Sequence, residues 1–182
     1  MSELTVASRY AKSLIDLAQE EKALEAIRKD MELFTHTLRD NHQLQAVLAN
    51  PIIAHDKKVK ILEALFKGKV HKVTDSFFKI MVNKSRAEVL YATAKEFINQ
   101  YNVIKHIFRA SVTSATPLSE ANKKTIIAEL EKATGGTIEL HAKVDHHLIG
   151  GFVLTIGDKQ VDTSILSSLK KLKTDFARGV NQ

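Results

Sequence analysis

Residues 90–113, LYATAKEFINQYNVIKHIFRASVT, contain a change of pattern that separates two kinds of structure. Up to Phe108 the apolar residues recur at alternating steps of four and three, which places them along one face of a helix. Beyond it, Ala110 and Val112 alternate with polar residues, a spacing typical of a strand with one polar face. The sequence therefore predicts a chain of two parts with a boundary near residue 105. The helical positions are Leu90, Ala94, Phe97, Tyr101, Ile104 and Phe108.

The part from residue 1 to 105 is predicted to be a bundle of six helices. Apolar residues repeat most regularly over residues 24–38, as in a helix that packs against another at a shallow angle. Asn50-Pro51 ends a short third helix, because the residue before a proline is pushed out of helical geometry. Gly68 is the predicted end of the fourth helix. The positions that define the first five helices are Val6, Tyr10, Leu14, Leu17; Leu24, Ile27, Met31, Phe34, Leu38; Leu44, Val47, Leu48; Val59, Leu62, Leu65, Phe66; and Val73, Phe77, Phe78, Ile80, Met81, Val82.

The part from 106 to 182 is predicted to be a smaller domain with the element order β-α-β-β-α. Six of the seven glycines lie after residue 134, and among them Gly135-Gly136 ends a helix that begins after Ser119. Gly157-Asp158 suits the two-residue loop of a hairpin, and Ser164 is the predicted N-cap of a last helix. The chain as a whole is therefore expected to be α+β. The apolar positions are Ile126, Ile127, Leu130; Ile138, Leu140, Ala142, Val144; Phe152, Leu154, Ile156 with Val161 on the return strand; and Ile165, Leu169, Leu172, Phe176.

Composition excludes several classes of protein. The 182-residue chain has no cysteine, which rules out disulfides, thiolate metal sites and cysteine nucleophiles. Its longest apolar run, Leu148 to Leu154, is far shorter than the roughly 20 residues needed to cross a bilayer. The first ten residues lack the apolar core of a secretory signal and the Arg-rich character of a transit peptide. We therefore expect a mature N-terminus that faces the cytosol.

Charge leaves a nucleic-acid partner open as the alternative function. The net charge is +6, and residues 56–86 carry nine basic and three acidic residues, whereas residues 1–40 carry six and eight. A helix, a turn at Gly68 and a second helix over residues 57–84 would fit a basic helix-turn-helix protein. Against this, the second helix offers few Arg, Asn or Gln side chains with which to contact base edges.

No set of residues has the pattern of a catalytic or metal site. His146 and His147 are adjacent, so on an extended segment they point to opposite faces, and His141 adds no ligand spacing. Gly150-Gly151 is followed by neither a lysine-serine pair nor a helix, unlike a phosphate-binding loop. The G-x-S-x-G and H-E-x-x-H motifs are also missing. We expect no enzyme activity, no metal and no cofactor, and assign no role to the three histidines.

The helix over residues 73–82 has more apolar residues than one buried stripe requires. One row is Val73, Phe77 and Ile80, and its neighbour is Phe78, Met81 and Val82. Either the bundle surrounds this helix on all sides, or one row lines a groove for an amphipathic helix of a partner, which is a recurring mode of recognition. The sequence leaves both interpretations open.

Five segments follow one another along the chain: ASRYAK at 7–12, LANP at 48–51, NKSR at 83–86, VTSA at 112–115 with PLS at 117–119, and VDHHLIGGFVL at 144–154 with IGD at 156–158 and DTS at 162–164. Together and in this order they resemble the delta-subunit family of F-type ATP synthases, whose mitochondrial relative is the oligomycin-sensitivity-conferring protein (OSCP). The resemblance covers nearly the whole chain. The family often has proline at the place of His146 and glycine at the place of Thr163, so the turns there are expected to differ.

The resemblance implies a non-catalytic stator subunit at the top of the catalytic head. Such a subunit joins alpha subunits to the peripheral stalk of b subunits, so that the head resists rotor torque during proton-driven ATP synthesis. Residues 1–105 would bind the alpha subunit, and residues 106–182 would bind the C-terminal end of b. The resemblance also implies one copy per complex, no nucleic-acid partner, no direct membrane insertion, and a peripheral location on the cytoplasmic face of the bacterial inner membrane.

Carried onto this sequence, the family's groove for an N-terminal helix of an alpha subunit lies between the first and fifth helices. Small Ser13 beside Tyr10 would leave room for an incoming side chain. The residues that carry the resemblance in the second part are expected to have structural roles. The expected groove residues are Tyr10, Ser13, Leu14, Leu17, Phe77, Ile80 and Asn83, and the expected structural residues are Gly150, Gly151, Gly157, Asp158, Asp162 and Ser164.

Overall fold

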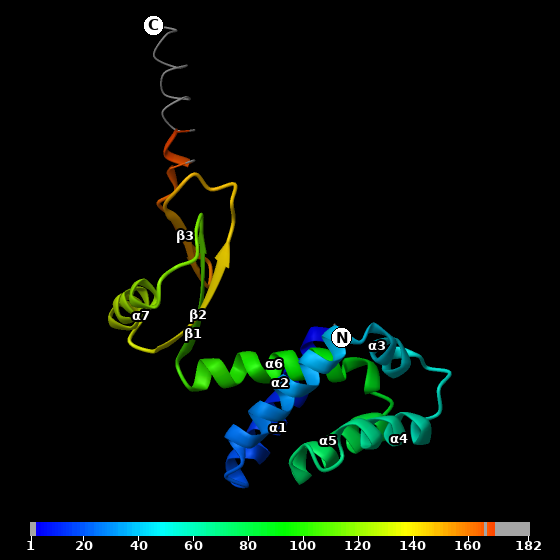
Figure 1. The fold of residues 1–182 in the computed structure, drawn as a ribbon. Coiled ribbons are helices and arrows are strands. Elements are labelled where there is room, and N and C mark those ends of the chain that lie inside the picture. Colours follow the sequence, from blue (N-terminus) through cyan, green and yellow to red (C-terminus); the bar gives the residue numbers. More distant parts are fainter. Residues whose placement is uncertain (1–2, 166, 170–182) are drawn as a thin grey trace, which may run out of the picture. The chain divides into compact units, whose positions relative to one another are not determined.

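The computed structural model describes residues 3–165 and 167–169, and tertiary contacts divide the chain into two units. The first unit, residues 1–102, is helical (Figure 1). The second unit, residues 103–182, is built around a small mixed sheet (Figure 1). The chain is therefore α+β. None of the described helices combines the length and the hydropathy that a membrane span requires.

Most of the first unit is α-helix. Its α-helices are α1 (Glu3–Glu20), α2 (Leu24–Asp40), α3 (His42–Ala49), α4 (His55–Phe66), α5 (Lys72–Asn83) and α6 (Leu90–Ile104), and a short 3-10 helix that was not predicted, η1 (Ala87–Val89), precedes α6. The end of α3 agrees with the predicted break, since Asn50 before Pro51 has extended backbone angles. Asn41 caps α3 by accepting a hydrogen bond from the backbone N–H of Leu44 at 3.2 Å.

Three phenylalanine rings join α2, α4 and α5 in the core. The ring centroid of Phe34 lies 4.6 Å from that of Phe78 and 5.4 Å from that of Phe66. Phe66 and Phe78 meet edge to face at 5.9 Å. Aromatic pairs of this kind add about 0.5–1.5 kcal/mol each to the free energy gained by burying their surface. The regular apolar repeat of α2 thus faces α4 and α5.

A carboxylate from α2 fixes the beginning of α5. Asp30 is 8% exposed and accepts hydrogen bonds from the backbone N–H of His71 at 2.7 Å and from the hydroxyl of Thr74 at 2.6 Å. A negative charge is favourable there because the first N–H groups of a helix have no partner within it and the helix dipole is positive at that end. Asp30 therefore determines where α5 begins relative to α2.

Tyr101 connects α6 to α2. Its hydroxyl donates a 2.6 Å hydrogen bond to Oε2 of Glu25, and the guanidinium of Arg28 lies 4.9 Å from its ring centroid. Burial of the phenol, followed by the hydrogen bond to Glu25, raises the pKa of Tyr101 above its ordinary value. The neutral phenol is thus the form that the folded state stabilises.

We expect Tyr101→Phe to lower the free energy of unfolding at pH 7 by about 1.5–3 kcal/mol, because a hydrogen bond to a charged group contributes that much. Since the folded-state pKa is raised, this contribution is complete below a pH of about 10 and is lost as the pH rises through the folded-state pKa. Urea unfolding of both proteins at pH 7 and pH 11 measures it. A stability difference of equal size at both pH values would contradict the assignment.

The prediction that the sixth helix continues to Phe108 is wrong, because α6 ends at Ile104. His106 has a φ of 52°, which a helix does not accommodate, and its carbonyl accepts a hydrogen bond from the backbone N–H of Thr137 at 3.0 Å. β1 (Ile107–Ser114) starts directly afterwards. Phe108 fits both the helical repeat and the strand alternation, so the spacing of apolar residues could not locate the break.

The second unit contains a four-stranded sheet with the strand order β2-β1-β3-β4. β1 pairs in parallel with β2 (Thr137–Val144), and α7 (Glu120–Thr134) forms the crossover between them. β3 (Phe152–Ile156) runs antiparallel to β1, and β4 (Lys159–Asp162) runs antiparallel to β3. The predicted order β-α-β-β-α lacks one strand, although the return strand expected at Val161 is present as β4. Every residue of β4 is exposed, so apolar alternation does not mark it as a separate element.

The apolar core of the second unit is small. Ala110, Val112 and Ile138 are buried, whereas Ala142 and Val144, which the alternation of β2 predicted to face the core, are exposed. No residue of α7 is fully buried. The caps of α7 agree with the prediction: the Ser119 hydroxyl accepts from the N–H of Asn122, and Gly135 has a φ of 70°. A helical segment begins at Ile165, but the predicted positions Leu172 and Phe176 lie outside the described residues.

Candidate partner-binding surfaces

One face of α1 borders a hollow of about 220 Å³. Its lining consists of Val6, Arg9, Tyr10 and Ser13 from α1 and Arg86 from the segment after α5. Tyr10 is half-buried and Ser13 is exposed. Since residues three and four apart share a helix face, the hollow follows the stripe on which Val6, Tyr10 and Ser13 lie. It has an apolar wall and two guanidinium groups at its edge.

The other predicted groove residues differ in exposure. Leu17 on α1 is 42% exposed and Ile80 on α5 is 52% exposed, so both offer apolar surface. Asn83, the last residue of α5, is also exposed. Leu14 and Phe77 are 1% and 9% exposed and belong to the core of the free chain. Of the seven predicted residues, Tyr10 and Ser13 line the hollow, and the rest do not.

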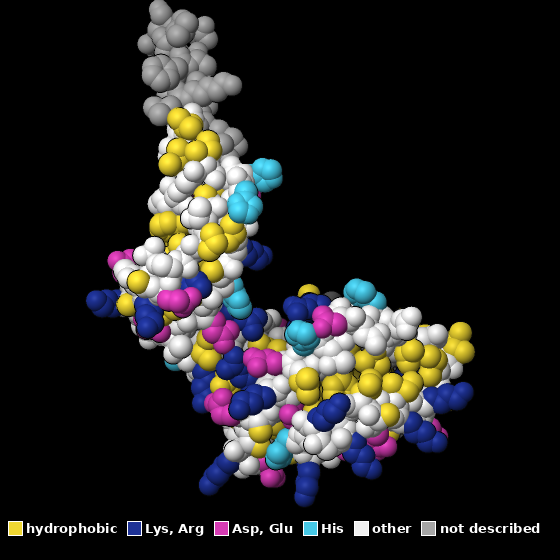
Figure 2. All heavy atoms as spheres, viewed as in Figure 1, with side chains coloured by type: hydrophobic (Ala, Val, Ile, Leu, Met, Phe, Trp, Pro, Cys, Tyr) yellow, Lys and Arg dark blue, Asp and Glu magenta, His cyan; other side chains and the backbone are white. Residues whose placement is uncertain are grey.

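Arg9 and Arg86 were not among the predicted groove residues. Both arginines lie within segments that carried the resemblance, ASRYAK at 7–12 and NKSR at 83–86. Their place in these two segments is the feature of the sequence that could have pointed to them. Figure 2 shows that apolar side chains also gather on the visible face of the first unit, with Lys and Arg side chains around them.

The apolar surplus of α5 has a mixed explanation. Phe77, Phe78, Met81 and Val82 are buried among the other helices, so most of both predicted rows belongs to the core, while Ile80 remains at the surface. Lys79 beside it is held by ion pairs with Glu63 at 2.7 Å and Asp75 at 2.9 Å. The hydrogen bond to Glu63, followed by that to Asp75, raises the pKa of Lys79. The helix-turn-helix alternative requires basic or amide side chains that are free to reach a base edge, and on α5 the side chain of Lys79 is held by two carboxylates.

Four of the six predicted structural residues meet at one place in the second unit. The backbone N–H of Thr163 donates to the carbonyl of Phe152 at 3.0 Å, and that of Ile165 donates to Gly150 at 3.0 Å. Gly151 has a φ of 77° and lies against the carbonyl of Thr163. The segments around Gly150-Gly151 and Asp162 to Ser164 are thus hydrogen-bonded to each other.

Asp162 and Ser164 order the turn that follows β4. Asp162 accepts hydrogen bonds from the backbone N–H of Ser164 at 2.8 Å and from the hydroxyl of Ser167 at 2.7 Å. Ser164 is buried, and its hydroxyl accepts from the N–H of Ser167, as an N-cap does. Gly157 and Asp158 lie elsewhere, in the exposed turn between β3 and β4.

Three histidines of the second unit, His141, His146 and His147, are exposed. Within the described part of the chain, no three His, Asp or Glu side chains lie close enough together to hold a metal ion. The described residues therefore offer surfaces on which a partner can pack, and they do not offer a group of metal ligands.

Known proteins identify the family of this chain. Residues 6–176 match the family model for the ATP synthase delta (OSCP) subunit. The chain is 42% identical over 183 aligned positions to the ATP synthase subunit delta of Cytophaga hutchinsonii, covering 99% of this chain and 98% of the relative. It is 34% identical to that of Chlorobaculum tepidum, covering 95% and 96%.

The fold also has a solved counterpart. A chain in the cryo-EM structure of the Toxoplasma gondii mitochondrial ATP synthase hexamer matches with a TM-score of 0.71 at 20% identity, covering 94% of this chain and 97% of that one. The nucleic-acid alternative finds no support among these relatives. Residue pattern, fold and relatives agree that the chain belongs to the ATP synthase delta (OSCP) subunit family.

Proposed function

We propose that this protein is a non-catalytic stator subunit of the F-type ATP synthase peripheral stalk, joining the alpha subunits of the catalytic head to the b-subunit stalk. Membership of the delta-subunit family over nearly the full length supports this function. A stator has to bind two partners firmly and perform no chemistry. The chain offers surface of that kind in each unit, one copy serving each complex at the cytoplasmic face of the membrane.

In this proposal the first unit receives an N-terminal helix of an alpha subunit along α1 and α5. The observation that carries it is the hollow beside Tyr10 and Ser13, together with the exposed side chains of Leu17 and Ile80. An amphipathic helix buries its apolar face in such a surface. Each side chain that becomes fully buried contributes about 1.5–3 kcal/mol before the costs of ordering are subtracted.

We expect Tyr10→Asp and Ile80→Asp each to weaken binding of an alpha-subunit N-terminal peptide at least about tenfold, because a charge replaces apolar contact surface. Helix content measured by circular dichroism should stay unchanged, since neither side chain is in the core. Ile52→Asp is the matched control, because Ile52 is 91% exposed in the loop between α3 and α4. Titration calorimetry in which both variants bind like the control would rule out this surface.

The second unit is proposed to contact the C-terminal end of the b subunit. Its support is the apolar surface left by a small core: Phe108, Val144 and Ile149 are 37%, 43% and 64% exposed. An apolar surface of this kind is expected where a second chain packs. The hydrogen-bonded segments around Gly151 and Thr163 would keep that unit ordered while it transmits force between head and stalk.

A further inference from the structure

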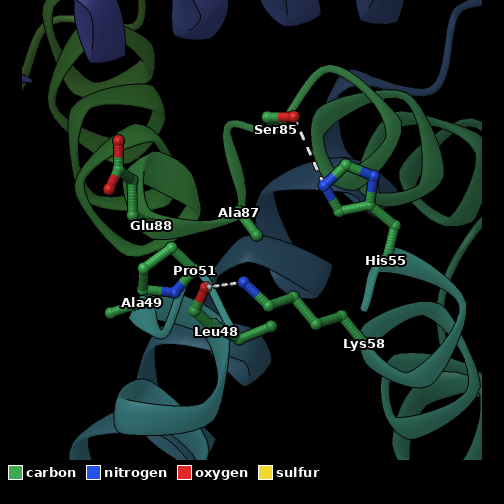
Figure 3. A pocket seen from close by; sticks show the side chains of 8 residues that line it. All are labelled: Leu48, Ala49, Pro51, His55, Lys58, Ser85, Ala87 and Glu88. Atoms are coloured by element: carbon green, nitrogen blue, oxygen red, sulfur yellow. Dashed lines mark hydrogen bonds between the residues drawn. The ribbon is translucent and has the colours of Figure 1, made fainter. Parts of the chain in front are cut away.

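We propose that a second hollow in the first unit binds a small oxyanion, with inorganic phosphate as the reference ligand. The hollow has a volume of about 190 Å³ and shares no lining residue with the one beside α1. At about 30 Å³ per water molecule, it has room for an oxyanion and some of its hydration. Leu48, Ala49, Pro51, His55, Lys58, Ser85, Ala87 and Glu88 line it (Figure 3).

The central feature of this hollow is a buried cation. Lys58 is 5% exposed, and its Nζ donates one hydrogen bond, of 2.7 Å, to the carbonyl of Leu48 near the end of α3. No carboxylate of the described residues forms an ion pair with it. The negative end of the α3 dipole compensates part of its charge, but an ammonium group has three donors. A buried charge in a protein is normally paired with an opposite charge. The ammonium group of Lys58 therefore offers an anion both a positive charge and N–H donors beyond the one bonded to Leu48.

Other donors converge on the same place. Nε2 of His55 and the hydroxyl of Ser85 lie 3.3 Å apart across the hollow (Figure 3). If Nε2–H of His55 donates to Ser85, the hydroxyl proton is left for an oxyanion; if the hydroxyl donates to Nε2, an oxyanion binds Ser85 by replacing this contact. His55 also begins α4, whose N-cap Ala54 provides no side-chain hydrogen bond. Asp56 in the first turn already places a negative charge at the positive end of that helix, so anion binding depends on the side chains of Lys58, His55 and Ser85 and not on the helix dipole.

Glu88 is the acidic member of the lining. Its side chain is exposed, and Figure 3 shows its carboxylate directed away from Lys58. It therefore lies at the mouth, where solvent screens its repulsion of an anion. The binding groups of the site are Lys58, Ser85 and His55, and the apolar side chains of Leu48 and Pro51 limit its size.

The backbone at Ser85 provides a way to separate binding from stability. Ser85 has a φ of 57° at the position that ends α5, with its N–H bonded to Val82 and the next N–H bonded to Met81. Glycine is usually found at such a position because it has no side chain to strain. Serine at this position is less stable than glycine would be, and it places a hydroxyl group in the lining of the hollow.

The test is a titration of the full chain with sodium phosphate at constant ionic strength balanced by chloride. Calorimetry and amide NMR spectra should show saturation with a dissociation constant of about 1 mM, corresponding to a single small site. The shifted amides should lie at the end of α3, the start of α4 and residues 85–88. Sulfate, which is also a tetrahedral oxyanion, should displace phosphate from the site. Shifts that rise linearly without saturation would overturn the proposal.

Three variants assign the site. Ser85→Gly should raise the melting temperature by about 2–8 °C, as relief of roughly 1 kcal/mol of backbone strain does, yet weaken phosphate binding at least threefold. Lys58→Met should weaken it at least tenfold, and Lys57→Met, an exposed neighbour with the same change of charge, should leave it unchanged. If Lys58→Met does not fold, Ser85→Gly decides the question. Phosphate affinity in Ser85→Gly equal to the parent protein, or equal losses in both lysine variants, would refute this site.

Discussion

Asp30→Ala should lower the free energy of unfolding of the first unit by about 3–5 kcal/mol. The carboxylate accepts from the N–H of His71 and the hydroxyl of Thr74, and both bonds are charge-assisted. Each such bond contributes about 1.5–3 kcal/mol, and its removal leaves the buried hydroxyl of Thr74 and the partly buried N–H of His71 without this acceptor. The expected change is a large fraction of the stability of a domain of this size.

The matched control is Asp40→Ala on the same helix. Asp40 also carries a negative charge and pairs with His36 at 2.9 Å, but its side chain is 57% exposed, so its removal should change stability by no more than about 0.5 kcal/mol. Urea unfolding followed by circular dichroism measures both variants. If the two differ by less than 1 kcal/mol, as surface pairs of this kind would, Asp30 does not hold α5.

A third variant separates the two bonds of Asp30. Thr74→Val removes only the hydroxyl donor, so it should cost less than Asp30→Ala, and the double variant should cost less than the sum of the single ones. Hydrogen exchange gives the location of the effect. In Asp30→Ala the amides in the first turns of α5 should lose more protection than those of α1.

Periodicity in the sequence located the helices but not the contacts between them. The repeat of Leu24, Ile27 and Met31 predicted α2 because apolar spacing is a local property. Asp30 lies beside that stripe and resembles any solvated acidic residue. Its partners are 41 and 44 residues away, and no local pattern indicates that α5 begins next to it. The same holds for Lys58, which looks like its exposed neighbour Lys57 until α3 is seen beside it.

The second unit was harder to predict because its elements are weakly amphipathic. β4 has no buried residue, and the alternation of β2 continues to Val144 although that residue is exposed. Phe108 satisfied a helix and a strand pattern at once. In contrast, resemblance to a family located residues that periodicity could not, since Gly151, Asp162 and Ser164 come together only through backbone contacts between two loops.

Gly151→Ala should destabilise the second unit by about 3 kcal/mol or more. A residue with a side chain is strained by roughly 1–2 kcal/mol at a φ of 77°. Its Cβ would also lie 2.4 Å from the carbonyl oxygen of Thr163 and 3.0 Å from Cα of Ser164. Both atoms are backbone, so the loop must move and weaken the bonds from Thr163 to Phe152. Each lost hydrogen bond adds about 0.5–1.5 kcal/mol.

Gly157→Ala separates these two causes in the same unit. Gly157 has a φ of 53° but nothing within 4 Å of a Cβ placed there, so only the backbone strain of about 1–2 kcal/mol applies. NMR measures the thermal unfolding of the second unit in both variants. Hydrogen exchange at the amides of Thr163 and Ile165 then shows whether the bonds between the two loops are kept. Gly151→Ala should expose both amides, and Gly157→Ala should leave them protected. Equal losses in the two variants would mean that conformational freedom alone, and not the close approach of two backbone segments, explains the glycine at position 151.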